Sequence, residues 1–364
     1  MNNQYTLFTE VKPFYTTLLT ALANAQHTIS MMYFTYDYGE WSTEINRILC
    51  AKSAEGVQVR LMADEFGLTV DNAVNALRNR AMMEDLQRSG IQVEIFRPGG
   101  RRVSRFNRLH CKLCAIDQTT LLIGGSNIGD YYLDWQDTNL LMVGQIGNVA
   151  HQLYDYIRHY SNGNTPTTSD GDPIDKLNLA KLCTGDAQLL LTLPGRRQDI
   201  RRELLRLILN AEKSVYIRNW YFLPDKELLN ALLFQAEREV SVNILLSDRT
   251  RVPLVDAANY ITGHKLVRSG ARVFRYTQRY MHSKVAWNGQ GDIVLGSANM
   301  DTKALSGCFE CSLQLRNPIL ARQLRQAFEN DHYLSTQQTP QTFPKRPLPH
   351  QAASYVCSLA SAWL

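Results

Sequence analysis

Two short segments of the chain carry matched residues that suit phosphate chemistry. The two sets are His110, Lys112 and Asn127 in the first half, and His282, Lys284 and Asn299 in the second. Each asparagine closes a Gly-x-x-Asn segment that begins 14 residues after the histidine. Residues two apart on a strand emerge from the same face, so each histidine shares a face with its lysine. Two sets of identical spacing, one in each half, predict a single active site built from a duplicated unit.

These residue types match what cleavage of a phosphodiester requires. Histidine titrates near neutral pH, so one imidazole can act as a neutral nucleophile while the other is protonated and acts as an acid. Lysine and asparagine side chains can hold the non-bridging oxygens, where charge is concentrated. One histidine would then carry a covalent phosphoryl adduct, which water or an alcohol resolves. The set requires no metal and no cofactor, so we expect neither. A single buried histidine is more simply a core residue, and the duplication is what favours catalysis.

Carboxylates at matching positions complete each set. Asp137 follows His110 by 27 residues, and Glu310 follows His282 by 28. An imidazole ring is fixed by the group that its second nitrogen bonds. We therefore expect each carboxylate to orient the histidine of its own half, Asp137 with His110 and Glu310 with His282.

Similarity between the halves extends well beyond these residues. Residues 25–29 (Ala-Gln-His-Thr-Ile) resemble residues 211–215 (Ala-Glu-Lys-Ser-Val), and each segment follows an amphipathic helix, predicted around residues 12–24 and 199–210. Alternating helices and strands with short connections are typical of an α/β sandwich. We predict two pseudo-symmetric α/β/α sandwich domains with mixed, mostly parallel sheets and the active site at the interface between them.

The chain has 364 residues, which is long enough for two such domains. Residues 161–175 are polar and rich in turn-forming types, which marks a linker. The predicted boundaries are 1–162 for the N-terminal domain, 163–184 for the linker, 185–335 for the C-terminal domain and 336–364 for a tail. The segment from Ser354 to Leu364 reads as a short amphipathic helix that either touches lipid or, as we favour, docks on the body of the protein.

The composition is that of a soluble globular protein, with 45% hydrophobic and 20% charged residues. No run of about 18 apolar residues occurs, and the first four residues lack the features of a signal peptide. Both observations favour the cytoplasm and are compatible with attachment to a membrane surface. The Cys-x-x-Cys pairs at 111–114 and 308–311 lie in stretches that read as strands, where residues three apart face opposite ways. We therefore reject a zinc site there.

Basic residues gather in two places, although the net charge is only +5. The first cluster comprises Arg101, Arg102, Arg105 and Arg108, and the second comprises Arg196, Arg197, Arg201 and Arg202. Such clusters suit anionic partners, either phospholipid headgroups or nucleic acid, although a solvated surface is an equally simple reading of any one arginine. Arg105 and Arg108 beside His110, together with Ser297, are the candidate substrate contacts.

The paired motifs resemble the phospholipase D superfamily, whose signature is His-x-Lys-x4-Asp followed by Gly-Gly/Ser-x-Asn. The resemblance covers nearly all of residues 1–335. Residues 124–131, 135–138, 221–225 and 296–301 are more similar to bacterial cardiolipin synthases than to the nucleases of the superfamily. The resemblance implies a metal-independent phosphatidyl transferase of cardiolipin synthase type.

In that family role, His110 would be the nucleophile that takes the phosphatidyl group, and His282 would be the acid and then the base. Pseudo-symmetry allows the two roles to be exchanged. The donor would be phosphatidylglycerol, and the acceptor a second phosphatidylglycerol, phosphatidylethanolamine or another alcohol. We expect no nucleic acid partner, a cytoplasmic protein on the inner face of the cell membrane, and peripheral contact with anionic lipid. The sequence does not set the oligomeric state.

Three alternatives remain open. Water could be the acceptor, which would make the protein a phospholipase D that hydrolyses phospholipid to phosphatidic acid. A metal-independent nuclease of the same superfamily would use its arginines on a phosphate backbone, and its binding would fall steeply with salt. A non-catalytic binding protein is disfavoured, because both His–Lys–Asn sets are intact.

The chain departs from the family pattern in two respects. The motif aspartate is present as Asp117, but Gly289 stands at its second position. The seventh position points away from the catalytic face of a strand, so we infer a structural role for Asp117, replaced in the second half by the Asn288-Gly289 turn or by Asp292. The chain also lacks the N-terminal membrane helices of some bacterial cardiolipin synthases. We therefore expect membrane contact through the basic clusters, the C-terminal segment, and exposed aromatics such as Trp41 and Trp363.

Overall fold

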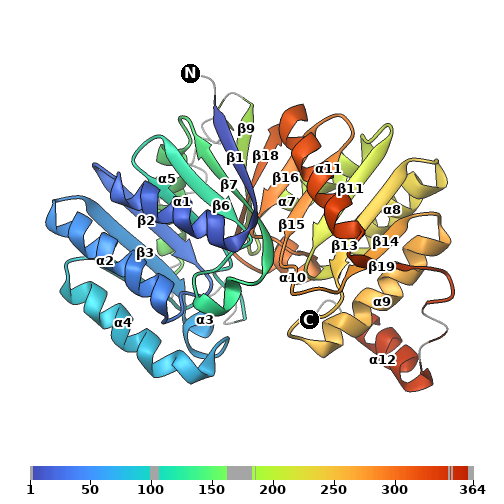
Figure 1. Cartoon of the computed structure of the whole chain (residues 1–364), viewed down its shortest axis with the longest axis horizontal. Helices are drawn as coiled ribbons and strands as arrows, with labels where there is room; N and C mark the ends of the chain where they lie inside the picture. The colour runs from blue at the N-terminus through green and yellow to red at the C-terminus, as the bar shows by residue number, and fades with distance from the viewer. Residues whose placement is uncertain are drawn as a thin grey trace.

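The computed structural model describes residues 3–98, 106–161, 183–184, 186–342, 345 and 347–359. Two β-sheets lie side by side, and each carries helices on its outer face (Figure 1). The elements of the first half are β1 (Gln4–Glu10), α1 (Val11–Ala23), β2 (Thr28–Tyr33), α2 (Glu40–Ala54), β3 (Gln58–Asp64), α3 (Glu65–Thr69), η1 (Ala73–Asn75), α4 (Ala76–Arg88), β4 (Gln92–Phe96), β5 (Leu113–Ile116), β6 (Thr120–Gly124), η2 (Asp130–Tyr132), β7 (Gln136–Val143) and α5 (Gly147–Arg158).

The second half repeats this order of elements with shorter connections before its motif. Its elements are β8 (Cys183–Thr184), β9 (Ala187–Leu193), β10 (Arg197–Gln198), α7 (Asp199–Leu209), β11 (Ser214–Asn219), β12 (Phe222–Leu223), α8 (Lys226–Glu237), β13 (Ser241–Ser247), α9 (Pro253–Arg268), β14 (Arg272–Tyr276), β15 (Lys284–Asn288), β16 (Asp292–Gly296), β17 (Met300–Asp301), α10 (Thr302–Ser306), β18 (Glu310–Arg316), α11 (Pro318–His332), β19 (Ser335–Gln338) and α12 (Leu348–Leu359).

The two main sheets are mixed. The first has the strand order β1-β7-β6-β5-β2-β3-β4, and the second β10-β9-β18-β16-β15-β11-β13-β14-β19. Within these two sheets, only β2–β3–β4 and β11–β13–β14 pair in parallel among the described strands. The α/β class with two similar units is as predicted, but the expectation of mostly parallel sheets is wrong. Helical crossovers connect only those three strands in each half, whereas β5–β6 and β15–β16 are short hairpins, which impose antiparallel pairing.

Side chains on the two faces of the first sheet pack in different apolar cores. Cys114 packs in the core beneath α1, α2 and α4, whereas Cys111 packs in a core shared by both halves. The two cysteines therefore lie on opposite sides of the sheet, as the alternation of a strand requires. The shared core also takes Leu153 from α5 and Leu324 from α11, so both sheets pack onto one continuous apolar layer. This layer fixes the two motifs relative to each other.

Two strands differ from the expected pattern, whereas the described part of the tail agrees with it. β1 and β9 add a strand at equivalent places, beside β7 and β18 respectively, and neither was predicted. The C-terminal helix α12 lies against α9, the arrangement we favoured over lipid contact for this segment (Figure 1). Most of the predicted linker 163–184, namely residues 163–182, lies outside the described residues, as does the end of the tail.

Candidate active site

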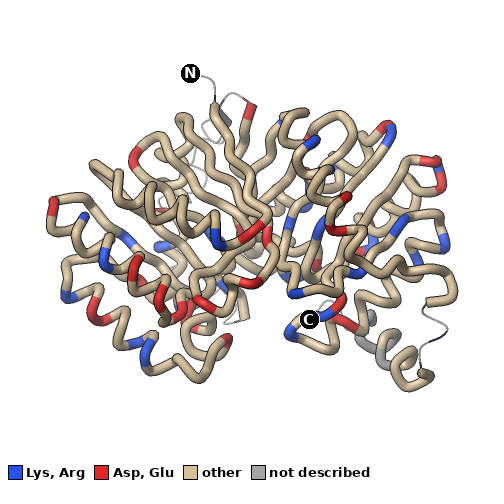
Figure 2. Tube along the Cα trace, in the orientation of Figure 1, with Lys and Arg blue, Asp and Glu red and all other residues tan. Residues whose placement is uncertain are grey.

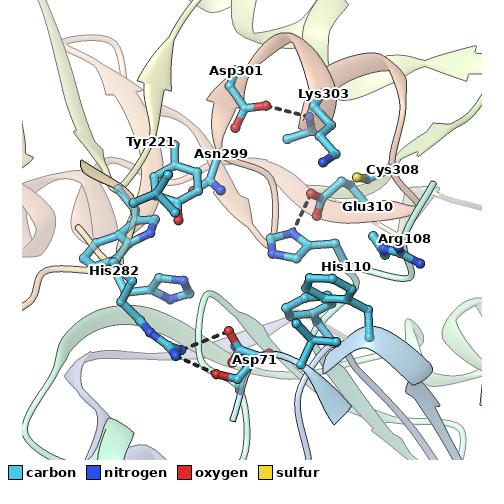
Figure 3. Close-up of a pocket in the computed structure, with 18 of the residues that line it drawn as sticks. Asp71, Arg108, His110, Tyr221, His282, Asn299, Asp301, Lys303, Cys308 and Glu310 are labelled. Atoms are coloured by element: carbon cyan, nitrogen blue, oxygen red, sulfur yellow. Dashed lines mark hydrogen bonds and ion pairs between the residues drawn. The ribbon is translucent and has the colours of Figure 1, made fainter. Parts of the chain in front are cut away.

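A cavity of about 570 Å³ opens between the two halves. His110, Asn127, His282, Asn299 and Glu310 all line it. The two histidines approach from opposite sides and face each other across the cavity (Figure 3). The structure therefore brings the two motifs together at a single site, although 172 residues separate the histidines.

Hairpins deliver the two motifs to this cavity. Lys112 immediately precedes β5, and Asn127 follows the end of β6 by three residues; β15 and β16 hold the second set in the same way. The glycines after β6 permit close packing behind the site. A Cβ atom at Gly125 would lie 2.1 Å from Oδ1 of Asp137, so any larger residue would displace this carboxylate.

Each histidine pairs with the carboxylate of the opposite half. Nδ1 of His110 lies 2.6 Å from Oε1 of Glu310, and Nδ1 of His282 lies 2.8 Å from Oδ2 of Asp137. The expectation that each carboxylate serves its own half is therefore wrong. The separation from histidine to carboxylate is nearly equal in the two halves, so it did not reveal that the carboxylates are exchanged. The pairing depends on the contact between the halves.

Main-chain bridges between the halves cause the exchange. The N–H group of His110 donates to the carbonyl of Phe309 at 2.8 Å, and that of His282 donates to the carbonyl of Gln136 at 2.7 Å. Phe309 and Gln136 are the residues just before the two carboxylates. Each bridge therefore aligns a motif with the strand of the opposite half, and the next side chain along that strand meets the imidazole.

Burial shifts the pKa of all four groups in the two histidine–carboxylate pairs. It lowers the pKa of both imidazoles well below the usual value, and the lysine charges nearby lower it further. Burial also raises the pKa of Glu310 to about 8 and that of Asp137 to about 6. The two carboxyl groups thus differ in acidity, so the two histidines have unequal partners.

The motif lysines lie behind the histidines, outside the cavity lining. Nζ of Lys112 donates to the carbonyl of His110 at 2.9 Å, and Nζ of Lys284 donates to the carbonyl of His282. Burial lowers the pKa of Lys284 to about 7. An ammonium has three donors, so each lysine retains donors beyond this bond. Their contact with phosphate oxygens stays a prediction.

The two asparagines differ in their bonding. Oδ1 of Asn127 accepts from the N–H group of Thr35 at 3.1 Å, and its Nδ2 donates to the hydroxyl of Tyr132 at 3.3 Å. Oδ1 of Asn299 is buried and has no hydrogen-bond partner in the described part of the chain. Within the described residues, Oδ1 of Asn127 therefore accepts a hydrogen bond and Oδ1 of Asn299 does not.

Aromatic rings enclose one histidine more than the other. Trp135 and Trp220 stack on each other, and His282 packs edge-on against both with ring centroids 5.6 and 5.3 Å away, whereas only Phe34 packs edge-on to His110, at 5.1 Å, among the ring contacts of the described residues. The side chain of His110 is 17% exposed and that of His282 is 9% exposed. His110 is thus the more accessible ring.

The three candidate substrate contacts have different positions. Arg108 lines the cavity, and its guanidinium lies over the ring of Phe66 at 4.8 Å. Ser297 is fully buried, and its hydroxyl donates to Glu310, so the expectation that it contacts substrate is wrong. It instead holds the carboxylate from behind. Arg105 lies outside the described residues.

The motif aspartate is far from the chemistry. Asp117 occupies the β5–β6 turn with a φ of 51°, and its carboxylate accepts from the N–H groups of three residues, Gln26, His27 and Thr28. In the second half, Oδ1 of Asn288 accepts from the N–H groups that close the β15–β16 turn. These contacts agree with the structural role inferred for this position.

Several residues that line the cavity were not predicted from the sequence. Arg251 forms a 2.9 Å ion pair with Asp71, which joins loops of the two halves across the cavity. Lys303 lies on the Glu310 side, next to Asp301, which caps α10 (Figure 3). Asp301, Trp135 and Trp220 stand inside the family-like stretches or beside them, which is a usable signal. Asp71 and Arg251 carry no such signal, because they lie in loops outside both motifs.

Comparisons with known proteins identify the family. A model of the cardiolipin synthase, PLD-like domain matches residues 18–160 and 204–332. The chain belongs to this cardiolipin synthase group of phospholipase D-like proteins. Cardiolipin synthase 1 of Staphylococcus epidermidis is 30% identical over 359 residues, which cover 95% of the chain and 71% of that protein. The cardiolipin synthase of Alkalihalophilus pseudofirmus is 27% identical over 369 residues, which cover 98% of the chain and 72% of that protein.

A solved structure supports the fold. Phosphatidylserine synthase of Haemophilus influenzae superposes with a TM-score of 0.75 at 17% identity, covering 99% of the chain and 95% of that protein. The family match and the curated relatives confirm the resemblance seen in the double motif and the assignment to an enzyme of the phospholipase D family, and the solved structure confirms the α/β fold class. No helix in the described part of the chain is both long and apolar enough to cross a membrane.

The basic cluster of the second half is neutralised by its neighbours. Arg197 and Arg202 both pair with Asp199, and Arg201 pairs with Asp225. Positive and negative residues are mixed over this half (Figure 2). Ion pairs therefore compensate much of the charge of this cluster, and its role as an anion-binding surface stays a prediction. Of the first cluster, Arg108 alone falls within the described residues.

One of the two aromatic residues expected at the membrane is not exposed. Trp41 is half-buried and packs against Tyr15, with ring centroids 5.3 Å apart. Trp363 lies outside the described residues. The expectation that Trp41 is an exposed anchor is wrong, because α2 turns this side chain toward α1.

Proposed function

We propose that this cardiolipin synthase homologue is a phosphatidyl transferase that forms cardiolipin from phosphatidylglycerol without a metal ion. One observation carries the proposal. Two histidine–carboxylate pairs from different halves face one cavity, so a nucleophile and an acid stand on opposite sides of the same phosphodiester. This arrangement suits double displacement at phosphorus, in which one ring is attached to the phosphoryl group while the other handles the proton.

In the first step, Nε2 of His110 attacks the phosphorus of phosphatidylglycerol. The bond between phosphorus and the glycerol oxygen breaks, and the imidazolium of His282 gives its proton to that oxygen. Free glycerol leaves, and a phosphatidyl group remains on His110. Oε1 of Glu310, in its ionised form, accepts from Nδ1–H of His110 and so holds the tautomer whose Nε2 lone pair is free.

In the second step, the acceptor hydroxyl gives its proton to the now neutral His282. The acceptor oxygen attacks phosphorus, the P–N bond breaks, and its electron pair returns to His110. When the acceptor is a second phosphatidylglycerol, the product is cardiolipin. Both histidines then stand in their starting protonation states.

The unequal carboxyl groups support this division of roles. Asp137 has the lower pKa of the two, so near neutral pH it offers His282 a negative charge, which opposes the lowering of the imidazole pKa by burial and by the lysines and favours the imidazolium. Glu310 has a pKa near 8 and offers His110 less negative charge, which favours a neutral nucleophile. The greater exposure of His110 also suits the ring that must reach phosphorus.

Side chains around the cavity would hold the phosphate oxygens. Asn127 and Asn299 line the cavity, and Lys112 and Lys284 place positive charge just behind the histidines. Arg108 and Lys303 lie on the His110 side, where the phosphate of a second lipid would enter. We propose that this side chain clamp replaces a metal ion. We further propose that the protein acts as two domains with the boundaries given above, on the cytoplasmic face of the membrane.

Incubation of the purified protein with phosphatidylglycerol vesicles and a chelator tests the proposal. Cardiolipin and an equal amount of free glycerol are expected, and the variants His110→Gln and His282→Gln should lose this turnover. Phosphatidic acid as the sole product would assign the protein to the hydrolases. Unchanged lipid together with cleaved nucleic acid would overturn the proposal in favour of a nuclease.

A further inference from the structure

Exposed apolar side chains line the cavity or stand on the chain segments that supply its lining residues. We call this group of side chains the mouth rim. Its members are Phe66, Val70, Val74, Leu77, Phe106 and Leu254. Phe66, Val70 and Phe106 also line the cavity itself. The rim therefore continues the inner wall of the active site out onto the surface.

The degree of exposure sets this rim apart from ordinary surface residues. Val74 is 89% exposed and Leu77 is 83% exposed, which leaves almost nothing of either side chain packed on the protein. Val74 lies in η1 and Leu77 in the first turn of α4, so both project from ordered elements. Single exposed apolar residues are common on proteins, but a contiguous group around a cavity marks an interaction site.

The rim includes residues of both halves. The segment that follows α3 supplies Val70 and Val74, and the start of α9 supplies Leu254. The ion pair between Asp71 and Arg251 joins these two segments at 2.9 Å. Both segments lie along the same edge of the molecule, where the two halves meet (Figure 1). They can therefore meet one flat surface at the same time.

We infer that the mouth rim is the membrane-docking surface and that it inserts into the headgroup region of an anionic lipid monolayer. The inference rests on the proposed function, because a diacyl lipid substrate must keep its acyl chains in apolar surroundings while its phosphate is at the histidines. A cavity of about 570 Å³ that also holds the reacting groups is too small for the chains of two lipids. An apolar rim pressed into the monolayer lets the chains remain in the bilayer.

The charges around the rim suit an anionic lipid surface. Arg78 and Arg80 are exposed in the first turns of α4, next to Leu77, and Arg249 is exposed close to Leu254. Arginine at the level of the headgroups attracts anionic lipid, while apolar side chains beside it enter the acyl boundary. This combination favours a phosphatidylglycerol-rich monolayer over an apolar protein partner.

The double variant Val74→Ser/Leu77→Ser tests the inference, with Ile319→Ser as the matched control. Ile319 is 61% exposed on α11, away from the cavity lining, so its replacement removes a comparable apolar side chain elsewhere. Serine removes apolar surface and adds no charge, so any effect is separate from repulsion by the membrane. Vesicle flotation measures binding to phosphatidylglycerol vesicles. Turnover is measured both on those vesicles and on phosphatidylglycerol with six-carbon chains, kept below its micelle concentration.

We expect the double variant to lose at least tenfold in vesicle binding and in vesicle turnover, and to match the parent within twofold on the monomeric substrate. The control should match the parent in all three assays. Vesicle binding and turnover of the double variant within twofold of the parent would overturn the inference. So would a parent dimer that the double variant dissociates without loss on vesicles, because the rim would then be a protein interface. Absence of turnover by the parent on either substrate would contradict the proposed function instead, while flotation still decides the role of the rim.

Discussion

Double-mutant cycles on the free energy of unfolding test the crossed pairing of histidines and carboxylates. The first cycle combines His110→Ala with Glu310→Gln, and the second combines His110→Ala with Asp137→Asn. The crossed arrangement predicts strong coupling in the first cycle and little in the second. Pairing within each half, which the sequence favours, predicts the reverse.

The structure sets the size of the expected coupling. Nδ1 and Oε1 of the His110–Glu310 pair are 2.6 Å apart, and Glu310 is fully buried, so water does not replace a lost partner. The cycles are measured at about pH 9, where Glu310 is ionised because its pKa is about 8, and a hydrogen bond to a charged group contributes about 1.5–3 kcal/mol. Ser297 still donates to the other carboxylate oxygen after removal of the imidazole, so we expect a coupling near the lower end, about 1.5 kcal/mol. Residues that share no contact couple by less than about 0.5 kcal/mol.

Urea unfolding of the parent and the variants, followed by fluorescence, provides these free energies when the slopes with denaturant agree. The mirror cycles supply the control, because His282 should couple strongly to Asp137 and weakly to Glu310. A coupling of His110 to Asp137 that exceeds its coupling to Glu310 would refute the crossed arrangement and the role of the main-chain bridges in it.

Three further sets of substitutions test other parts of the structure. Asp117→Ala should lower the free energy of unfolding by about 1–2 kcal/mol because three N–H groups lose their acceptor, whereas Gly289→Asp should leave turnover within twofold; a large rise in turnover would show that the missing aspartate matters for chemistry. Lys303→Ala and Arg108→Ala should each lower kcat/KM on phosphatidylglycerol about tenfold or more, mainly through KM, while Arg80→Ala on monomeric lipid should not. Glu310 binds its proton more tightly when folded, so its contribution to stability declines as pH rises from about 4.5 to about 8; Glu310→Gln should therefore become less destabilising across this window, and a constant difference from the parent would contradict the raised pKa.

Local patterns were sufficient to predict the motif residues and most helices. The helices expected at 12–24 and 199–210 are α1 and α7, because each carries a full apolar stripe over several turns. The two His–Lys–Asn sets converge because the repeated hairpins place them at equivalent points. These features depend on short-range spacing, which the sequence displays directly.

Features that depend on contacts between distant segments were not predictable in this way. β1 is a strand because it pairs with β7, more than 130 residues later, and its own seven residues give only a weak pattern. The crossed dyads and the Asp71–Arg251 ion pair depend on how the halves dock. Neither residue type nor spacing specifies that docking, and a pseudo-symmetric sequence makes both pairings look equivalent.

Trapping the covalent intermediate tests the central claim most directly. The parent protein would be mixed with phosphatidylglycerol for milliseconds, quenched in alkali to preserve a phosphoramidate, digested and examined by mass spectrometry. We predict a phosphatidyl group on the peptide that contains His110, formed together with one equivalent of glycerol and absent in His110→Gln. Cardiolipin formation with the adduct on His282, or with no adduct on either histidine, would contradict the proposed mechanism.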